Sequence, residues 1–341
     1  MERIRFGKTE LMVSKVAFGG IPIMRISKTE AAHLVREIIG LGINFIDTAN
    51  AYSDSEEKIG EAIKGIRREE IVIASKSLAN DKKTFNEHLD LGLKRLGVDY
   101  IDIYQLHNVN SEPRWDAVFA PGGAMEGLEE AIKAGKVRFP GFTSHSIPMA
   151  IELIKSGRFA SVQLPLNYID FAASDEALPL AKKLDMGFIA MKPMGGGYLE
   201  NAGLSFRFLM SYDGIVPDPG IEKIEEIREI IGIVNKNEAL SAEDKKEIEK
   251  QRAELGSSWC HRCDYCQPCP KSIQISTVLW IKSLLKRMAP ERARSMQVTA
   301  IENARNCLEC NACVSRCPYN LEIPSLLKEA ISFWDSQPDC G

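Results

Sequence analysis

The feature that most constrains the fold is an alternation of short apolar runs with helical patterns, repeated eight times. The runs lie in the first two thirds of the chain, at 15–20, 44–49, 71–76, 101–107, 137–144, 161–167, 187–193 and 215–221. Apolar residues recur at three- and four-residue spacing in the intervening stretches, for example at 28–42 and 175–187. Runs that are apolar on both faces are typical of parallel strands covered by helices.

Eight such units within about 220 residues predict a closed (β/α)8 TIM barrel of the α/β class. A doubly wound open sheet is the alternative, but no Gly-x-Gly-x-x-Gly follows the first run. We expect residues 1–14, before the first strand, to form a hairpin at the floor of the barrel.

The composition changes near residue 235, which predicts a barrel domain over 1–235. Residues 236–256 are highly charged and predict a connecting helix. All nine cysteines lie in the remainder, 257–341, where 275–288 has helical periodicity. We therefore expect a second, smaller and mainly helical ferredoxin-like domain.

Eight of the cysteines form two tight runs, each of which ends in Cys-Pro. The residues are Cys260, Cys263, Cys266 and Cys269 in the first run and Cys307, Cys310, Cys313 and Cys317 in the second. The second run has the spacing of bacterial ferredoxins, in which three close cysteines bind one 4Fe–4S cluster and the Cys-Pro cysteine binds the other. We expect one cluster on Cys260, Cys263, Cys266 and Cys317, and the second on Cys307, Cys310, Cys313 and Cys269. Two structural zinc sites are the alternative, and Cys340 is expected to be an uninvolved thiol.

Polar residues end three consecutive predicted strands of the barrel or follow directly after them. Asp47 and Tyr52 belong to the second strand and its loop, Lys76 ends the third, and His107 ends the fourth. Singly, such residues serve as helix caps or packed core residues. Together they predict a proton donor for carbonyl reduction, because an ammonium next to a tyrosine stabilises the phenolate. Asp47 would orient Lys76, and His107 would position the substrate carbonyl.

The segments FIDTANAY, ASK and DIYQLHN resemble the signature motifs of the aldo-keto reductases, in the same order. The resemblance implies that Asp47, Tyr52, Lys76 and His107 form the catalytic tetrad. It also implies that Ser144, His145 and Gln163 bind the nicotinamide carboxamide. With its cysteine runs the whole chain resembles a subgroup of oxidoreductases predicted in anaerobic prokaryotes.

Two positions depart from the family pattern around the dinucleotide. Met191 stands where the family has a tyrosine that stacks on the nicotinamide, and Lys223 has few other cations near it for an adenosine 2′-phosphate. Gly195 and Gly220 would let backbone approach a dinucleotide, or would only form tight turns. The resemblance implies NADP or NAD as cofactor.

The net charge of −4 argues against nucleic acid or an anionic membrane as partner. No apolar run has the length of a transmembrane helix or a signal segment, so we expect a cytoplasmic protein. The sequence favours an oxidoreductase that acts on a small carbonyl or alcohol and exchanges single electrons with a ferredoxin-type carrier. The alternatives are an electron-transfer or docking subunit with a silent barrel, and a reductase whose clusters are only structural.

Overall fold

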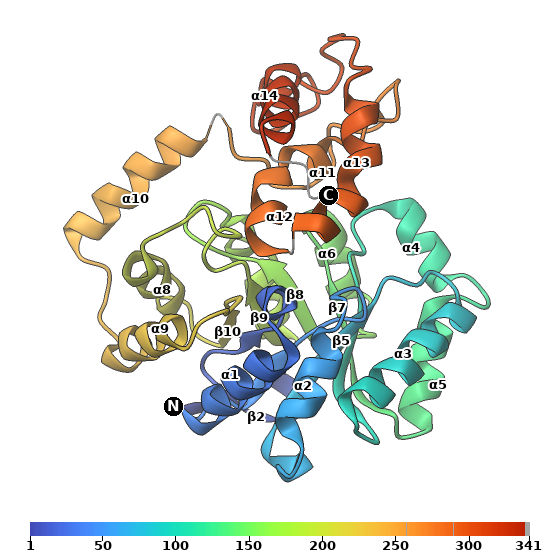
Figure 1. The fold of residues 1–341 in the computed structure, drawn as a ribbon, viewed down its shortest axis with the longest axis vertical. Coiled ribbons are helices and arrows are strands. Elements are labelled where there is room, and N and C mark those ends of the chain that lie inside the picture. The colour runs from blue at the N-terminus through green and yellow to red at the C-terminus, as the bar shows by residue number, and fades with distance from the viewer. Residues whose placement is uncertain (257, 289, 338–341) are drawn as a thin grey trace. The chain divides into compact units, whose positions relative to one another are not determined.

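A computed structural model describes residues 1–256, 258–288 and 290–337 of the chain (Figure 1). Its contacts divide the chain into two compact units. The first consists of Met1–Gly195 and Leu199–Leu240, and the second of Gly196–Tyr198 and Ser241–Gly341. Cys340 lies outside the described residues.

The first unit is an eight-stranded parallel barrel, which confirms the predicted fold. Its strands are β3 (Phe18–Gly19), β4 (Phe45–Asp47), β5 (Val72–Ser77), β6 (Ile101–Leu106), β7 (Val137–Thr143), β8 (Ser161–Pro165), β9 (Gly187–Met191) and β10 (Ile215–Asp218). They pair in the order β3 to β10. The ends of this series meet because the Ala17 and Gly19 N–H groups donate to the carbonyls of Pro217 and Pro219, each at 2.9 Å. The strands are buried on both faces, as the apolar runs predicted, except for the first half of β7, where Arg138 is exposed.

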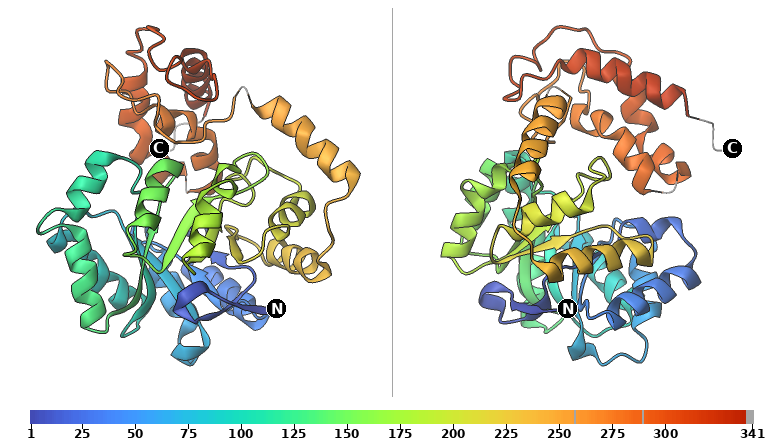
Figure 2. Two further views of the ribbon diagram at one scale, coloured as in Figure 1. Left: turned by 180° about the vertical axis from the view of Figure 1, so that it is seen from behind. Right: turned by 90° about the vertical axis from the view of Figure 1, so that its left-hand side faces the viewer.

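Nine helices accompany the barrel strands within the described residues (Figures 1 and 2). They are α1 (Lys28–Gly40), α2 (Ser55–Ile63), α3 (Lys82–Leu96), α4 (Glu112–Phe119), α5 (Ala124–Lys133), α6 (Ile147–Lys155), α7 (Ala177–Lys183), α8 (Ala202–Met210) and α9 (Ile224–Lys236). Their ends follow local rules: the Ser27 hydroxyl caps α1 together with Glu30, and α3 ends at Gly97 with φ +68°.

The predicted hairpin at the barrel floor is confirmed. Strands β1 (Arg3–Arg5) and β2 (Met12–Ser14) pair antiparallel. Phe6, Leu11 and Val13 of this segment share a core cluster with the first residues of the barrel strands, among them Phe45. Burying a side chain of this size contributes about 1.5–3 kcal/mol to the free energy of folding. The hairpin closes the floor of the barrel, which leaves the opposite end for chemistry.

The second unit is mainly helical within the residues described. Its helices are α10 (Ala242–Leu255), α11 (Ile275–Leu279), α12 (Ile281–Arg287), α13 (Pro290–Ala304) and α14 (Ile323–Asp335). Ile273, Ile301 and Leu327 lie in a core that also contains Cys266 and Cys317. Figure 2 shows the orange to red helices of this core from two sides.

The helix expected over 275–288 is two helices instead of one. They part at Trp280, whose indole N–H donates to the Cys260 carbonyl at 2.6 Å. The charged helix expected over 236–256 begins only at Ala242, because α9 ends at Asn237 in the left-handed conformation. The division of the chain at residues 235 and 257 stays a prediction.

None of the helices in the described part of the chain combines the length and the apolar character that crossing a membrane requires.

Candidate active site

The four residues of the predicted tetrad meet at the carboxyl ends of β4, β5 and β6. Asp47 is the last residue of β4, and Tyr52 lies in the loop that follows. Lys76 lies near the end of β5, and His107 directly follows β6. The strands place them together because Asp47 pairs in register with Ala74, and Lys76 with Gln105.

Lys76 and Asp47 form a buried ion pair at the centre of the site. Lys76 Nζ donates to Asp47 Oδ2 at 2.5 Å and to the Thr48 carbonyl at 2.7 Å. The side chains are only 1% and 2% exposed. Burial alone would lower the pKa of Lys76, but the interactions with its neighbours, led by that with the Asp47 carboxylate, outweigh burial and raise that pKa. Lys76 is therefore held in its charged form.

Tyr52 lies next to both Lys76 and His107. Lys76 Nζ is 5.2 Å from the centroid of the Tyr52 ring, and the Tyr52 and His107 rings are 6.0 Å apart at 81°. The backbone N–H of His107 donates to the Ser77 carbonyl at 2.9 Å, which fixes the backbone of His107 to β5. A phenol, an imidazole and an ammonium thus share one end of the barrel.

Ser144 and His145 follow β7 and are buried. The Ser144 hydroxyl donates to the Val109 carbonyl at 2.8 Å. The backbone N–H of His145 donates to Asn110 Oδ1 at 2.7 Å. Asn110 thus ties this turn to the loop after β6, a role that sequence reasoning did not assign.

Gln163 lies on β8, and its amide faces Asp218 at the end of β10. Gln163 Nε2 donates to Asp218 Oδ2 at 3.1 Å. Gln163 Oε1 is buried and has no hydrogen-bond donor among the described residues. The glutamine therefore offers one unused acceptor of the kind that a carboxamide N–H binds.

Asp218 was missed as a site residue, although it ends a strand as the tetrad residues do. The signal was in the sequence: an acidic residue in VPDPG at the close of the eighth apolar run. Only closure of the barrel brings it next to Asp47 and Lys76.

The four remaining predicted contacts lie around the ends of β9 and β10. Met191 is the last residue of β9 and is partly exposed. Gly195 has φ +56°, a conformation that favours glycine. Gly220 bridges to Gly19 and packs against Pro22, where a Cβ would lie 2.9 Å from the proline ring. The exposed Lys223 precedes α9.

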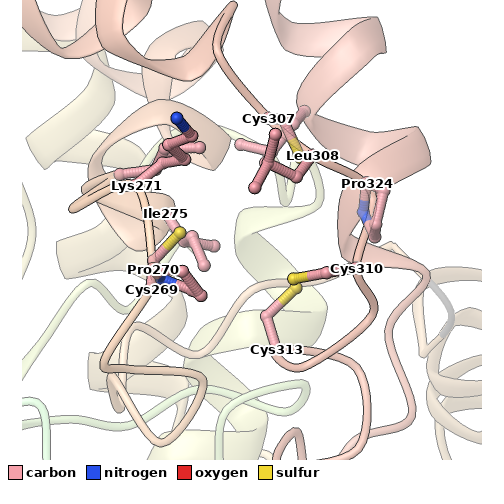
Figure 3. A pocket seen from close by; sticks show the side chains of 11 residues that line it. Cys269, Pro270, Lys271, Ile275, Cys307, Leu308, Cys310, Cys313 and Pro324 are labelled. Carbon is pink, nitrogen blue, oxygen red and sulfur yellow. The ribbon is translucent and has the colours of Figure 1, made fainter.

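One cavity in the second unit is lined by four cysteines drawn from both runs. Cys269, Cys307, Cys310 and Cys313 line it together with Ile275, Leu308 and Pro324. Figure 3 shows the side chains of Cys269, Cys310 and Cys313 on opposite sides of this cavity, with Cys307 beside Leu308. This is the set expected for one cluster, and a four-cysteine cage fits it.

The other four cysteines gather around the first run. Burial, together with the charges of Asp264 and neighbouring cysteines, raises the pKa of the Cys260 and Cys266 thiols to about 12. Burial and, among others, Cys317 raise the pKa of Cys263. Within the described residues, no three His, Cys, Asp or Glu side chains come close enough to hold a single metal ion.

The fold and the residues at the end of its barrel define the class of the protein: a (β/α)8 oxidoreductase joined to an iron–sulfur domain. The aldo/keto reductase family model matches residues 15–205, more than half of the chain, and a 4Fe-4S dicluster model matches 259–322. The chain therefore belongs to the aldo/keto reductase family, and the expected family, fold and 4Fe–4S domain are confirmed.

The chain is similar to several curated and solved members of the family. It is 30% identical to the uncharacterized oxidoreductase YrpG of Bacillus subtilis over 60% of this chain and 70% of that one. It is 28% identical to an NADH-specific methylglyoxal reductase of Escherichia coli over 58% of this chain and 69% of the relative.

Among solved structures, an aldo-keto reductase from Bacillus halodurans in its holo form aligns with a TM-score of 0.63 at 23% identity. That alignment covers 73% of this chain and 96% of the other. A Klebsiella pneumoniae aldo-keto reductase in complex with NADPH aligns with a TM-score of 0.62 at 20% identity, over 74% and 95% of the two chains.

Proposed function

We propose that the barrel interconverts a small carbonyl compound and its alcohol by hydride transfer with a nicotinamide dinucleotide. The observation that carries the proposal is the position of Lys76. Its ammonium is bonded to Asp47 and lies 5.2 Å from the Tyr52 ring. A charge held at this place would stabilise the phenolate that forms when the neighbouring phenol gives up its proton.

The reaction needs a hydride at the carbonyl carbon and a proton at the carbonyl oxygen. When bound, the dinucleotide supplies the hydride. Tyr52 donates the proton, and the attraction between Lys76 and the resulting phenolate lowers the cost of this step. His107 donates a hydrogen bond that holds the carbonyl oxygen next to Tyr52. In alcohol oxidation the same residues act in reverse, with Tyr52 as the base.

The buried residues beyond the tetrad fit a nicotinamide carboxamide. Gln163 Oε1 has no other donor in the described structure and would accept from the carboxamide N–H2. Ser144 and His145 would complete the contacts, while Met191, Gly195 and Gly220 would border the dinucleotide. The E. coli relative is named NADH-specific and the K. pneumoniae structure contains NADPH, so the family uses both dinucleotides.

We predict that NADH binds more tightly than NADPH, by about tenfold. The backbone N–H groups just before α9, where an adenosine 2′-phosphate would lie, already have an anionic partner. Glu226 accepts from the Glu222 and Lys223 N–H groups at 2.8 and 3.0 Å. A phosphate there would meet a like charge and lose these donors. Fluorescence titration of the anaerobic protein with both dinucleotides measures the two affinities.

Glu226→Gln is the matched control for this prediction. It removes the charge and is expected to improve NADPH binding while leaving NADH binding unchanged. Tighter NADPH binding by the unaltered chain would contradict the prediction, with Lys223 then the first residue to test as a phosphate ligand.

We further propose that the second domain holds two 4Fe–4S clusters that exchange single electrons with an external ferredoxin-type carrier. One would be bound by Cys269, Cys307, Cys310 and Cys313, and the other by Cys260, Cys263, Cys266 and Cys317. The support for electron exchange is exposure beside the first of these sets: Cys310 is exposed and Leu308 is 62% exposed. A carrier could therefore approach this cluster closely.

One observation favours a second candidate function, an electron-transfer subunit whose barrel is silent. Met191 stands where the family has its stacking tyrosine, and a thioether packs against a ring more loosely. Turnover decides between the two. Anaerobic protein with NADH and a panel of small aldehydes and ketones, beginning with methylglyoxal, is expected to form alcohol. A chain that carries both clusters but turns over no member of the panel would favour the silent barrel.

A further inference from the structure

A carboxylic acid outside the tetrad lies in the same buried centre. Asp218 ends β10, is 8% exposed, and accepts a hydrogen bond from Gln163 Nε2. Gly19 on β3 makes room for it, since a Cβ there would lie 2.9 Å from Asp218 Oδ1. Asp218 is therefore packed into the site and not turned toward solvent.

Two carboxyl groups lie near one ammonium in this centre, and only that of Asp47 is bonded to it. Burial raises the pKa of Asp218 well above its usual range, and the nearby charge of Asp47 acts in the same direction. Lys76 and Gln163 act in the opposite direction but do not offset the rise. Oδ1 of Asp47 and Oδ1 of Asp218 face no N–H or O–H donor from the described residues. A proton between the two carboxyls would satisfy both.

We propose that Asp218 stays protonated and donates a hydrogen bond to the Asp47 carboxylate. Asp218 is then a positioning residue for Lys76 and Tyr52. The inference rests on the proposed carbonyl reduction. With this proton in place, Asp47 is held from two sides, by Lys76 and by Asp218. The centre then contains one carboxylate and one ammonium.

Loss of this proton would change the electrostatics that Tyr52 experiences. A second carboxylate would compete for the charge of Lys76, so the phenolate that Tyr52 becomes on donating its proton would be less stabilised. Reduction would then slow as the pH rises. The residues that face or flank Asp218 from the strands around it are Gly19 on β3, Asp47 on β4, Lys76 on β5, Gln163 on β8 and Met191 on β9.

Infrared difference spectroscopy tests the protonation state without substrate. The wild-type spectrum minus that of Asp218→Asn at pH 7 is expected to contain the carbonyl band of one protonated carboxyl. Asp102→Asn is the matched control, because Asp102 is also buried but is paired with Arg68 at 2.6 Å and Arg138 at 2.8 Å. It should remove no such band. A wild-type difference spectrum without the band would overturn the proposal.

A second measurement covers the case in which Asp218→Asn does not fold. The carboxyl band of the wild-type chain is followed through an alkaline titration, and the same titration is made on Gln163→Leu. Because the Gln163 amide favours the ionised form of Asp218, its removal should move the loss of the band to higher pH. A band that disappears at the same pH in both proteins would contradict the assignment.

Kinetics tests the positioning role. Asp218→Leu, which cannot donate a hydrogen bond, is expected to lower kcat about tenfold more than Asp218→Asn, which can. The alkaline fall in kcat should move to higher pH in Asp218→Asn. A protonated carboxyl together with unchanged kcat profiles would overturn the positioning role. Absence of turnover in the wild type would instead contradict the proposed function and leave the infrared result standing.

Discussion

Replacement of Tyr52 by phenylalanine is expected to lower kcat for carbonyl reduction by about 10²–10⁴-fold, the usual contribution of a positioned acid. The ring remains, so its contacts with His107 and Lys76 persist, and only the proton donor is lost. Dinucleotide affinity and iron content should stay the same. Anaerobic steady-state rates with NADH, together with an iron and sulfide assay, measure these quantities.

Tyr104→Phe is the matched control for the tyrosine. Its hydroxyl is buried in the barrel, and its ring packs against Phe85 of α3, on the outer side of β6. The change removes the same atom from a place without a role in proton transfer, so kcat should not change. Equal rates for Tyr52→Phe and wild type would remove Tyr52 from its proposed role and favour the silent barrel.

The barrel could be predicted because its signal is local and repeated. Most of the apolar runs are buried on both faces, and eight of them in a row leave few other arrangements. The boundaries were less predictable where a single side chain decides them. The helix expected over 275–288 parts at Trp280, whose indole reaches back to the Cys260 carbonyl. The periodicity of the helical segment itself does not predict that hydrogen bond.

The position of the tetrad could be predicted for the same reason, since consecutive parallel strands bring their carboxyl ends together. The positions of Asp47, Lys76 and His107 could be predicted from the order of the strands alone. The position of Asp218 could not be predicted in this way, because β10 meets the first strand only when the barrel closes. The Glu226 cap on α9 likewise depends on how the chain enters that helix. Sequence therefore predicted contacts between neighbouring strands better than contacts made by closure or by capping.

Loss of Cys269 is expected to remove one cluster and leave the other. Cys269 lines the cavity with Cys307, Cys310 and Cys313, although in sequence it belongs to the other run. Cys269→Ala should therefore lower the iron content from about eight to about four atoms per chain. Because cluster binding contributes free energy to folding, the helices around the emptied site should also lose stability. Iron and sulfide assays on anaerobic protein and its far-UV circular dichroism measure both effects, with Cys340→Ser as a control that should retain all of the iron.

Two double variants decide which cysteines share a cluster. If Cys269 and Cys310 bind the same cluster, their joint replacement by alanine costs no more iron than either change alone, and about four atoms remain. Joint replacement of Cys269 and Cys263 should then remove both clusters. If each run instead held its own cluster, the two results would be exchanged, because Cys263 and Cys269 would be partners. The cavity that joins Cys269 to the second run predicts the first outcome. Each ligand set would then need cysteines from both runs, so that neither cluster could be completed before the chain between the runs has folded.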